Sequence, residues 1–390
     1  MIFSLPLRDF RSTIIQSRIS PISRPALLLT FGLATIGLIA SIATKFVITS
    51  LPNILPLVVG VVVLDALSQF VPQSRIVEAL QTFIYSVLYV VITCVCGVLA
   101  AYAMQRFAFP LQDKLFANVD LAFGLNWFGY AHWVDDHLGI QRIFHFAYDT
   151  ISVQIALPLV VLAFSNRQRE LRIYLLAFAI AFTVTIIISA LMPAAGPIEL
   201  VDRATFHILQ FTGATPLDHL TRLREAGPLI LNDAPGGIAT FPSFHATVAV
   251  LTPLTLRGYP RIFVVLLVLD AAMLGGTVTE GAHYFCDVVA GIGMAFFAHA
   301  LAKRIIGAED LGFNRVRIVG TDIALIEAPL AKRALPVRYV GRVVILTGSA
   351  APRASCRRAP QPAGAAHSTA QGAPAAPRLS PAPPSRASPN

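Results

Sequence analysis

Residues 244–302 read FHATVAVLTPLTLRGYPRIFVVLLVLDAAMLGGTVTEGAHYFCDVVAGIGMAFFAHALA, three apolar runs separated by two short polar turns. The runs cover residues 244–257, 261–277 and 284–302. The first turn carries Arg257 and Arg261, whereas the second, at 278–283, holds one acid and one histidine. Runs of this kind are typical of helices that cross a membrane. Since one helix descends and the next returns, the starts of the first and third runs should lie on the same side.

The rest of the chain has the composition of a membrane protein. Its 390 residues are 55% hydrophobic and only 13% charged, with a mean hydropathy of +0.68, far from the averages of soluble domains. A helix that crosses about 30 Å of hydrocarbon needs about 20 apolar residues. Besides the three runs above, the candidate spans are residues 27–49, 53–72, 79–104, 149–164 and 171–192. We therefore expect an all-α, polytopic transmembrane bundle of about eight spans.

Basic residues mark one side of this bundle. The positive-inside rule assigns the side richer in Lys and Arg to the cytoplasm. The basic residues before the first span and in the short connections on that side are Arg8, Arg11, Arg18, Arg24, Arg75, Arg167, Arg169, Arg172, Arg257, Arg261, Lys303 and Arg304. We interpret the net charge of +9 as this topology signal and expect no nucleic-acid partner. The prediction is an integral protein of a bacterial inner membrane, with both termini cytoplasmic and the active site periplasmic.

The chain divides into four regions by composition. They are the N-terminal segment with two spans (1–74), a catalytic membrane domain (75–303), a cytoplasmic juxtamembrane segment (304–344) and a tail rich in Ala, Pro, Ser and Arg (345–390). The tail has too few large apolar side chains for a packed core, so we expect disorder there. The long connection 105–148 mixes aromatic and acidic residues, which indicates interfacial helices on the outer face.

Two histidines stand at the outer starts of predicted spans. His245 lies in GIATFPSFHAT, residues 237–247, and His283 in HYFCDVVAG, residues 283–291. Asp287 follows His283 by four positions, which on a helix places the carboxylate within reach of a ring nitrogen. A carboxylate there fixes the tautomer of the ring and raises the nucleophilicity of the other nitrogen.

These residue types can cleave a phosphate ester. A neutral imidazole can attack phosphorus while a protonated one donates to the departing oxygen, so the displacement passes through a phosphohistidine. The N–H groups of Phe244 and His245, together with Ser243, are placed for the phosphate oxygens. The glycine-rich approach that ends at Gly237 suits the same role. One interfacial histidine is usually only a hydrogen-bonded side chain, but two at matched depth favour the catalytic interpretation.

Other polar residues carry competing interpretations. Tyr148 and Gln154, near the start of the fourth span, could bind a headgroup or simply cap and join helices. We interpret the polar residues inside predicted spans as hydrogen-bonding groups of the bundle; they are Lys45, Asp65, Gln154 and Asp270. The segment 132–137, HWVDDH, has metal-ligand residue types, but its two histidines are five apart and do not share a helical face. We expect neither a metal nor an organic cofactor.

The segments Pro242-Ser243-Phe244-His245 and His283-x3-Asp287 resemble two motifs of the type 2 phosphatidic acid phosphatase (PAP2) superfamily. The similarity is greatest to its branch like inositol phosphorylceramide synthase, and it covers about residues 75–303. The resemblance implies that His245 is the general acid and His283 the nucleophile that accepts phosphate. It likewise implies that Asp287 orients the nucleophile.

Two basic motifs of the phosphatases in that superfamily are absent. The phosphatases place Ser-Arg seven and six residues before the second histidine, where this chain has Gly276 and Thr277. Their lysine seven residues ahead of Arg-Pro is also missing, and the transferase-like branch resembles this chain in lacking both. Other cations must then meet the phosphate charge, and the outer-face candidates are Arg142, Arg203, Arg222 and Arg224.

The expected function is that of an integral membrane lipid phosphatase or phosphotransferase. The acceptor decides between the two, because water gives a phosphatase and an alcohol such as inositol gives a headgroup transferase. A non-catalytic lipid carrier of the same architecture is a third alternative. The expected partners are the bilayer and a phospholipid or sphingolipid-like substrate, and the sequence predicts no oligomeric state.

Overall fold

The computed structural model describes residues 21–49, 74–200, 216–225, 227–231 and 237–313, the strands 337–340 and 343–346, and a few single positions between these ranges. The chain separates into two compact units, residues 1–316 and 317–390. The second unit contains an antiparallel hairpin of β3 (Val337–Val340) and β4 (Val343–Leu346). The predicted tail 345–390 lies almost wholly outside the described residues, so its disorder stays a prediction.

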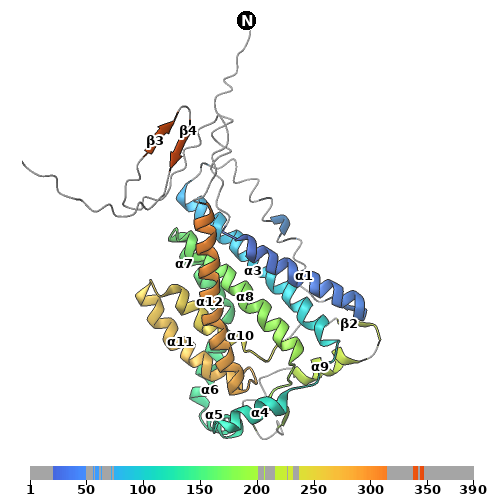
Figure 1. Cartoon of the computed structure of the whole chain (residues 1–390). Coiled ribbons are helices and arrows are strands. Elements are labelled where there is room, and N and C mark those ends of the chain that lie inside the picture. Colours follow the sequence, from blue (N-terminus) through green and yellow to red (C-terminus); the bar gives the residue numbers. More distant parts are fainter. Residues whose placement is uncertain are drawn as a thin grey trace, which may run out of the picture. The chain divides into compact units, whose positions relative to one another are not determined.

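The described part of the first unit is almost entirely helical (Figure 1). Its long helices are α1 (Arg24–Thr44), α3 (Arg75–Gln105), α7 (Ile151–Phe164), α8 (Gln168–Leu191), α10 (Phe244–Leu256), α11 (Pro260–Thr279) and α12 (Phe285–Phe313). Its shorter elements are α4 (Asp113–Ala122), α5 (Trp127–Asp135), α6 (Leu138–Asp149), the 3-10 turn Pro197–Leu200, α9 (Pro216–Arg224) and the parallel pair β1 (Phe46–Ile48) and β2 (Leu229–Leu231).

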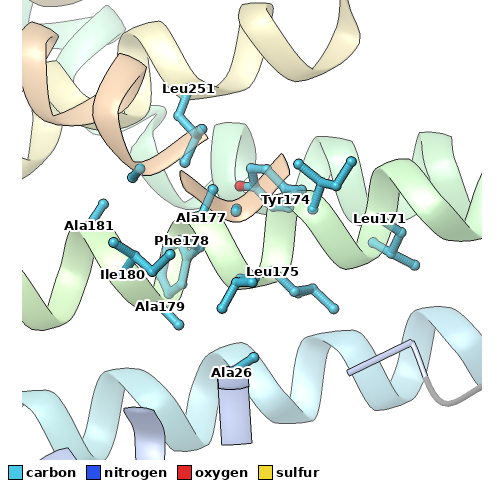
Figure 2. Close-up of a cluster of buried hydrophobic side chains, with 14 of the residues drawn as sticks. Ala26, Leu171, Tyr174, Leu175, Ala177, Phe178, Ala179, Ile180, Ala181 and Leu251 are labelled. Carbon is cyan, nitrogen blue, oxygen red and sulfur yellow. The ribbon is translucent and has the colours of Figure 1, made fainter. Parts of the chain in front are cut away.

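Helix α8 lies at the centre of the bundle and contacts α1, α3, α7, α10 and α12. After Arg172 its residues are almost wholly apolar on every side, the pattern of a helix surrounded by protein. Figure 2 shows Leu175, Phe178 and Ile180 of α8 in the core, with Ala26 of α1 and Leu251 of α10 close by. This core holds the helices that carry the candidate site in fixed positions.

Fewer helices qualify as membrane spans than the sequence predicts. Among the described residues five are long and apolar enough, namely α1, α3, α8, α11 and α12, and α6 with α7 make a sixth if that pair, bent by 49°, is one span. The count of about eight is therefore not confirmed. The run 244–257 becomes α10, a helix of 13 residues that Gly258 and Pro260 follow. At about 1.5 Å per residue it is shorter than the bilayer core.

The polar residues that the sequence places inside predicted spans have different outcomes in the structure. Lys45 does not lie within the first span but ends α1 in the left-handed conformation, with φ 53°. The predicted span 53–72, with Asp65, lies almost wholly outside the described residues. Gln154 on α7 and Asp270 on α11 are buried in the bundle, as the sequence predicts.

One end of the bundle gathers the short elements. Tyr89 of α3 donates to the Ala26 carbonyl (3.0 Å) and Arg106 donates to the Thr44 carbonyl (3.3 Å), so α1 and α3 run in the same direction. Helices α4 and α5 lie across this end of the bundle (Figure 1). The segment 105–148 thus forms the short helices α4, α5 and α6, as the sequence predicts.

The opposite end holds those basic residues of the predicted cytoplasmic side that the structure describes there, among them Arg169 and Arg172. Arg169 pairs with Asp310 (2.9 Å), and Arg172 pairs with Glu309 (2.6 Å). These pairs hold the start of α8 against α12, which continues beyond the predicted end at 302 to Phe313. The division into four regions stays a prediction.

The close approach of α10 and α12 supports a test of stability. A Cβ at Gly291 would overlap the carbonyl oxygen of Ser243, whereas one at Gly293 would meet nothing within 4 Å. Because backbone atoms cannot move aside cheaply, Gly291→Ala should destabilise the protein by about 1–3 kcal/mol. Thermal unfolding in detergent measures the loss. Gly293→Ala is the matched control, and equal melting temperatures for the two variants would contradict the predicted helix contact.

Candidate active site

A cavity of about 220 Å³ lies at the end of the bundle that carries the short helices. Its walls come from α3, α8, the segment 237–240, the start of α10 and the turn that ends at His283. Gly237, Tyr148, His245 and His283 all line it. The two histidines, 38 positions apart in sequence, therefore reach one cavity, as the alternation of spans predicts.

His283 and Asp287 form the predicted pair. His283 Nδ1 lies 3.2 Å from Asp287 Oδ2, and the two residues are only 4% and 0% exposed. An ionised carboxylate only accepts hydrogen bonds, so opposite an ionised Asp287 a neutral His283 ring has its hydrogen on Nδ1 and its lone pair on Nε2. That is the tautomer that a nucleophilic imidazole needs.

The local geometry of this pair differs from the expected one. His283 does not lie on a helix, because α12 begins at Phe285. Asp287 instead occupies the first turn of α12, where its Oδ2 also accepts the N–H of Tyr284 (3.0 Å). A carboxylate three residues into a helix commonly binds the backbone N–H before the helix. The interpretation of two residues on one helical face is therefore wrong, although the contact that it predicts is present.

Ser243 links the starts of α10 and α12. It is the N-cap of α10, its hydroxyl accepting the N–H of Ala246 (3.4 Å). The same hydroxyl lies 3.4 Å from His283 Nε2, and the Ser243 N–H donates to the Asp287 carbonyl (3.0 Å). The N–H groups of Phe244 and His245 lie in the first turn of α10 and have no acceptor within the helix.

Tyr148 and Gly281 fix the two histidine rings. The Tyr148 ring stacks on His245, with 3.9 Å between the centroids and 12° between the planes. A Cβ at Gly281 would lie 2.6 Å from the His283 ring and 3.0 Å from the Tyr148 hydroxyl. Because Gly281 lacks that carbon, Tyr148 and His283 can both lie against it.

Glu280 is a site neighbour that the sequence interpretation overlooked. Its side chain is only 4% exposed, and Oε2 lies 2.8 Å from His145 Nδ1. Burial raises the pKa of the Glu280 carboxyl, and the hydrogen bond with His145 opposes the rise. The pair ties α6, which carries Tyr148, to the end of α11. The signal for it was the single acid in the turn 278–283.

Two aspartates of α4 were also overlooked. Asp120, 3% exposed, accepts the N–H groups of Phe285 and Cys286, both at 2.8 Å, and so caps α12. Asp113 accepts the N–H of Gly196 (2.8 Å) and the hydroxyl of Tyr284 (3.0 Å). Asp120 thus holds the backbone that follows His283 from 165 residues away, and Asp113 holds the Tyr284 side chain from 171 residues away. Local sequence patterns do not reveal contacts at such separations.

The remaining candidates lie apart from the cavity. Gln154 is buried on α7, where it donates to Thr150 (3.1 Å), and does not line the cavity. Arg142 and Arg222 are exposed, and Arg203 is outside the described residues. In the segment 132–137, His132 packs on Phe206 with ring centroids 4.4 Å apart, and His137 Nδ1 lies 2.7 Å from the Trp133 carbonyl. No group of three or more metal-ligating residues occurs within the described ranges.

Arg224 does not line the cavity either, but its burial distinguishes it from Arg142 and Arg222. It is half-buried on α9, and its Nε and one terminal nitrogen have no hydrogen-bond partner in the described part of the chain. Burial lowers the pKa of the Arg224 guanidinium, and the nearby Asp113 carboxylate raises it. Arg224 thus has two buried nitrogen donors without a partner, and it lies near Asp113, which binds the backbone of Ala195 and Gly196.

Gly276 and Thr277, which stand where the phosphatases have Ser-Arg, are tightly packed in the bundle. A Cβ at Gly276 would lie 2.8 Å from the Phe144 carbonyl oxygen of α6. Thr277 is fully buried, and its hydroxyl donates to the Met273 carbonyl (2.7 Å). Helix α6 therefore occupies the space that a side chain would need at position 276.

Fold and site together define a polytopic helical membrane protein with a histidine–aspartate pair and a second histidine at one cavity. A family model described as the PAP2 superfamily matches residues 114–301, a range that includes all three residues. Neither the curated proteins nor the solved structures that were compared gave a match. The family match and the apolar helices fit a membrane phosphatase-type function.

Proposed function

We propose that this protein takes a phosphoryl group, or a phosphorylated headgroup, from a lipid through a covalent intermediate on His283. The observation that carries the proposal is the His283–Asp287 pair (3.2 Å) beside a cavity that His245 also lines. The pair supplies an oriented nucleophile, and His245 supplies a separate acid.

The reaction proceeds in two displacements. His283 Nε2 attacks phosphorus, the bond between phosphorus and the lipid oxygen breaks, and His245 gives its proton to that oxygen. Water or an alcohol then attacks the phosphohistidine, giving its proton to His245 while the phosphorus–nitrogen bond breaks. Both histidines return to their first protonation states, so no redox partner is required. Asp287 stabilises the positive charge that His283 acquires.

The start of α10 suits the charge of the transferred group. First-turn N–H groups and the positive end of the helix dipole favour anions. Ser243 places its hydroxyl 3.4 Å from the attacking nitrogen, where it can donate to a phosphate oxygen. Preorganised donors at such a point stabilise the charge that develops in the transition state.

An apolar cavity supports a lipid as donor. It measures about 590 Å³ and lies between α4 and α12, with Phe116, Phe241 and Cys286 in its lining. Thr240 lines the candidate active site and the next residue, Phe241, lines this cavity. The two cavities thus adjoin one segment, and the second has the apolar lining that an acyl chain would require.

Arg224 is the cation that we assign to the phosphate. Arg224→Gln should lower kcat/KM about 10- to 100-fold, because a charge-assisted hydrogen bond to the substrate is lost. Arg222→Gln, two residues earlier on the same helix with an exposed side chain, is the matched control. Assays of purified protein in detergent give both values. Equal activity of the two variants would remove Arg224 from the site.

The identity of the acceptor decides between phosphatase and transferase. The close packing of α6 against Gly276 favours the transferase, because it leaves no room there for the serine of the Ser-Arg motif of the phosphatases. Purified protein should then release little inorganic phosphate from a lipid phosphate until a polyol is added, when a new lipid appears. Free phosphate without a polyol would establish a phosphatase. If neither product forms, the protein is better explained as a non-catalytic lipid carrier. The same holds if replacing both histidines leaves the products unchanged, because those products then do not come from this site.

The proposed orientation places the candidate active site in the periplasm of a bacterial cell and both termini in the cytoplasm. It is supported by the basic residues at the end of the bundle opposite His283, among them Arg169 and Arg257.

A further inference from the structure

A second polar cavity lies at the basic end of the bundle. It measures about 250 Å³ and lies between the turn that joins α7 to α8, the turn that joins α10 to α11, and α12. Four cations line it, and Glu170 is the one acid in its lining; the cations are Arg167, Arg169, Arg257 and Lys303. None of these residues has a part in the proposed reaction.

Two of the four cations are compensated and two are not. Arg167 pairs with Glu170 (3.3 Å), and Arg169 pairs with Asp310 (2.9 Å). Arg257 and Lys303 have no ion pair within the described ranges. Both act electrostatically on His299, which lines the same cavity. Arg257 and Lys303 are both exposed, so water screens part of their repulsion, and an anion between them would replace that repulsion with attraction.

The same cavity contains unused hydrogen-bonding groups. The Tyr259 hydroxyl and His299 Nδ1 are both buried, and neither has a hydrogen-bond partner in the described residues. Buried polar groups in native proteins nearly always have a partner. A ligand that accepts hydrogen bonds and carries negative charge would satisfy the hydroxyl and compensate both cations.

We propose that this cavity binds a phosphate-bearing anion. A phosphate group combines negative charge with several acceptor oxygens, which matches two cations and a hydroxyl donor. Phosphate groups reach this end of the bundle from two sources, the headgroups of anionic lipids and free phosphate compounds. Basic pockets between helices at a membrane surface commonly bind anionic headgroups. The site is separate from the proposed reaction and does not depend on it.

Five proteins test the proposal: wild type, Arg257→Gln with Lys303→Gln, Tyr259→Phe, a variant in which His245 and His283 are both replaced, and Arg304→Gln as the control. Arg304 is basic, exposed and adjacent to Lys303, but it does not line the cavity. Inorganic phosphate is titrated into each in detergent, with heat and melting temperature recorded. In a second arm, nanodiscs of zwitterionic lipid are compared with nanodiscs that contain phosphatidylglycerol.

We expect the double variant to lose at least tenfold in phosphate affinity at this site, and Tyr259→Phe to lose less. Arg304→Gln should behave as the wild type, and replacing His245 and His283 should leave this site intact. A gain in melting temperature only with phosphatidylglycerol would identify a lipid headgroup as the ligand. A gain only with free phosphate would identify a soluble anion as the ligand. Equal titrations of the double variant and the control, or no response in either arm, would overturn the proposal.

Discussion

His283→Asn is expected to lower turnover of a lipid phosphate by about 10⁴-fold or more, because the attacking nitrogen is lost. Asparagine is the sharpest replacement, since its amide N–H can take the place of Nδ1–H against Asp287 and spare the buried carboxylate from losing its partner. The loss should therefore come from chemistry and not from unfolding. The rate of product formation by purified protein in detergent measures it.

The control for this variant is His137→Asn. His137 is exposed, stands just before α6 and does not line the candidate active site. A second readout is direct: wild type quenched during turnover should carry a phosphate that acid releases and base does not, and His283→Asn should carry none. Activity of His283→Asn within tenfold of the wild type would exclude the phosphohistidine.

The sequence predicts those contacts of the site that depend only on how far apart His245, His283 and Asp287 lie along the chain. Two successive helices between His245 and His283, α10 and α11, return the chain to the same end, although α10 is too short to count as a span. The four-residue spacing of His283 and Asp287 allows their contact both on a helix and across a helix start. The prediction of the contact was therefore correct even though α12 begins after His283.

The rest of the site depends on tertiary packing. Asp113 and Asp120 read as ordinary polar residues of an interfacial helix, because the backbone N–H groups that they accept are far away in sequence. The break at Thr150, where α6 and α7 meet at 49°, carries no proline or glycine to mark it. That bend brings Tyr148 onto His245, a stacking contact that periodicity could not indicate.

The effect of His245→Asn should depend on the leaving group of the substrate, which distinguishes the role of an acid from that of a nucleophile. With an alkyl phosphate, whose alkoxide leaves poorly, loss of the proton donor should lower kcat/KM about 10²- to 10⁴-fold. With a nitrophenyl phosphate the leaving group departs as a stable anion, so the same variant should lose less than about tenfold. Steady-state kinetics with both esters measure the two ratios.

The comparison with His283→Asn makes this test specific. A variant that lacks the nucleophile should fail with both esters, because no leaving group can replace the attacking nitrogen. A variant that has merely loosened the stack of Tyr148 on His245 should also lose activity equally with both. Only loss of a proton donor depends on the leaving group, so equal losses for His245→Asn with the two esters would contradict its assignment as the acid.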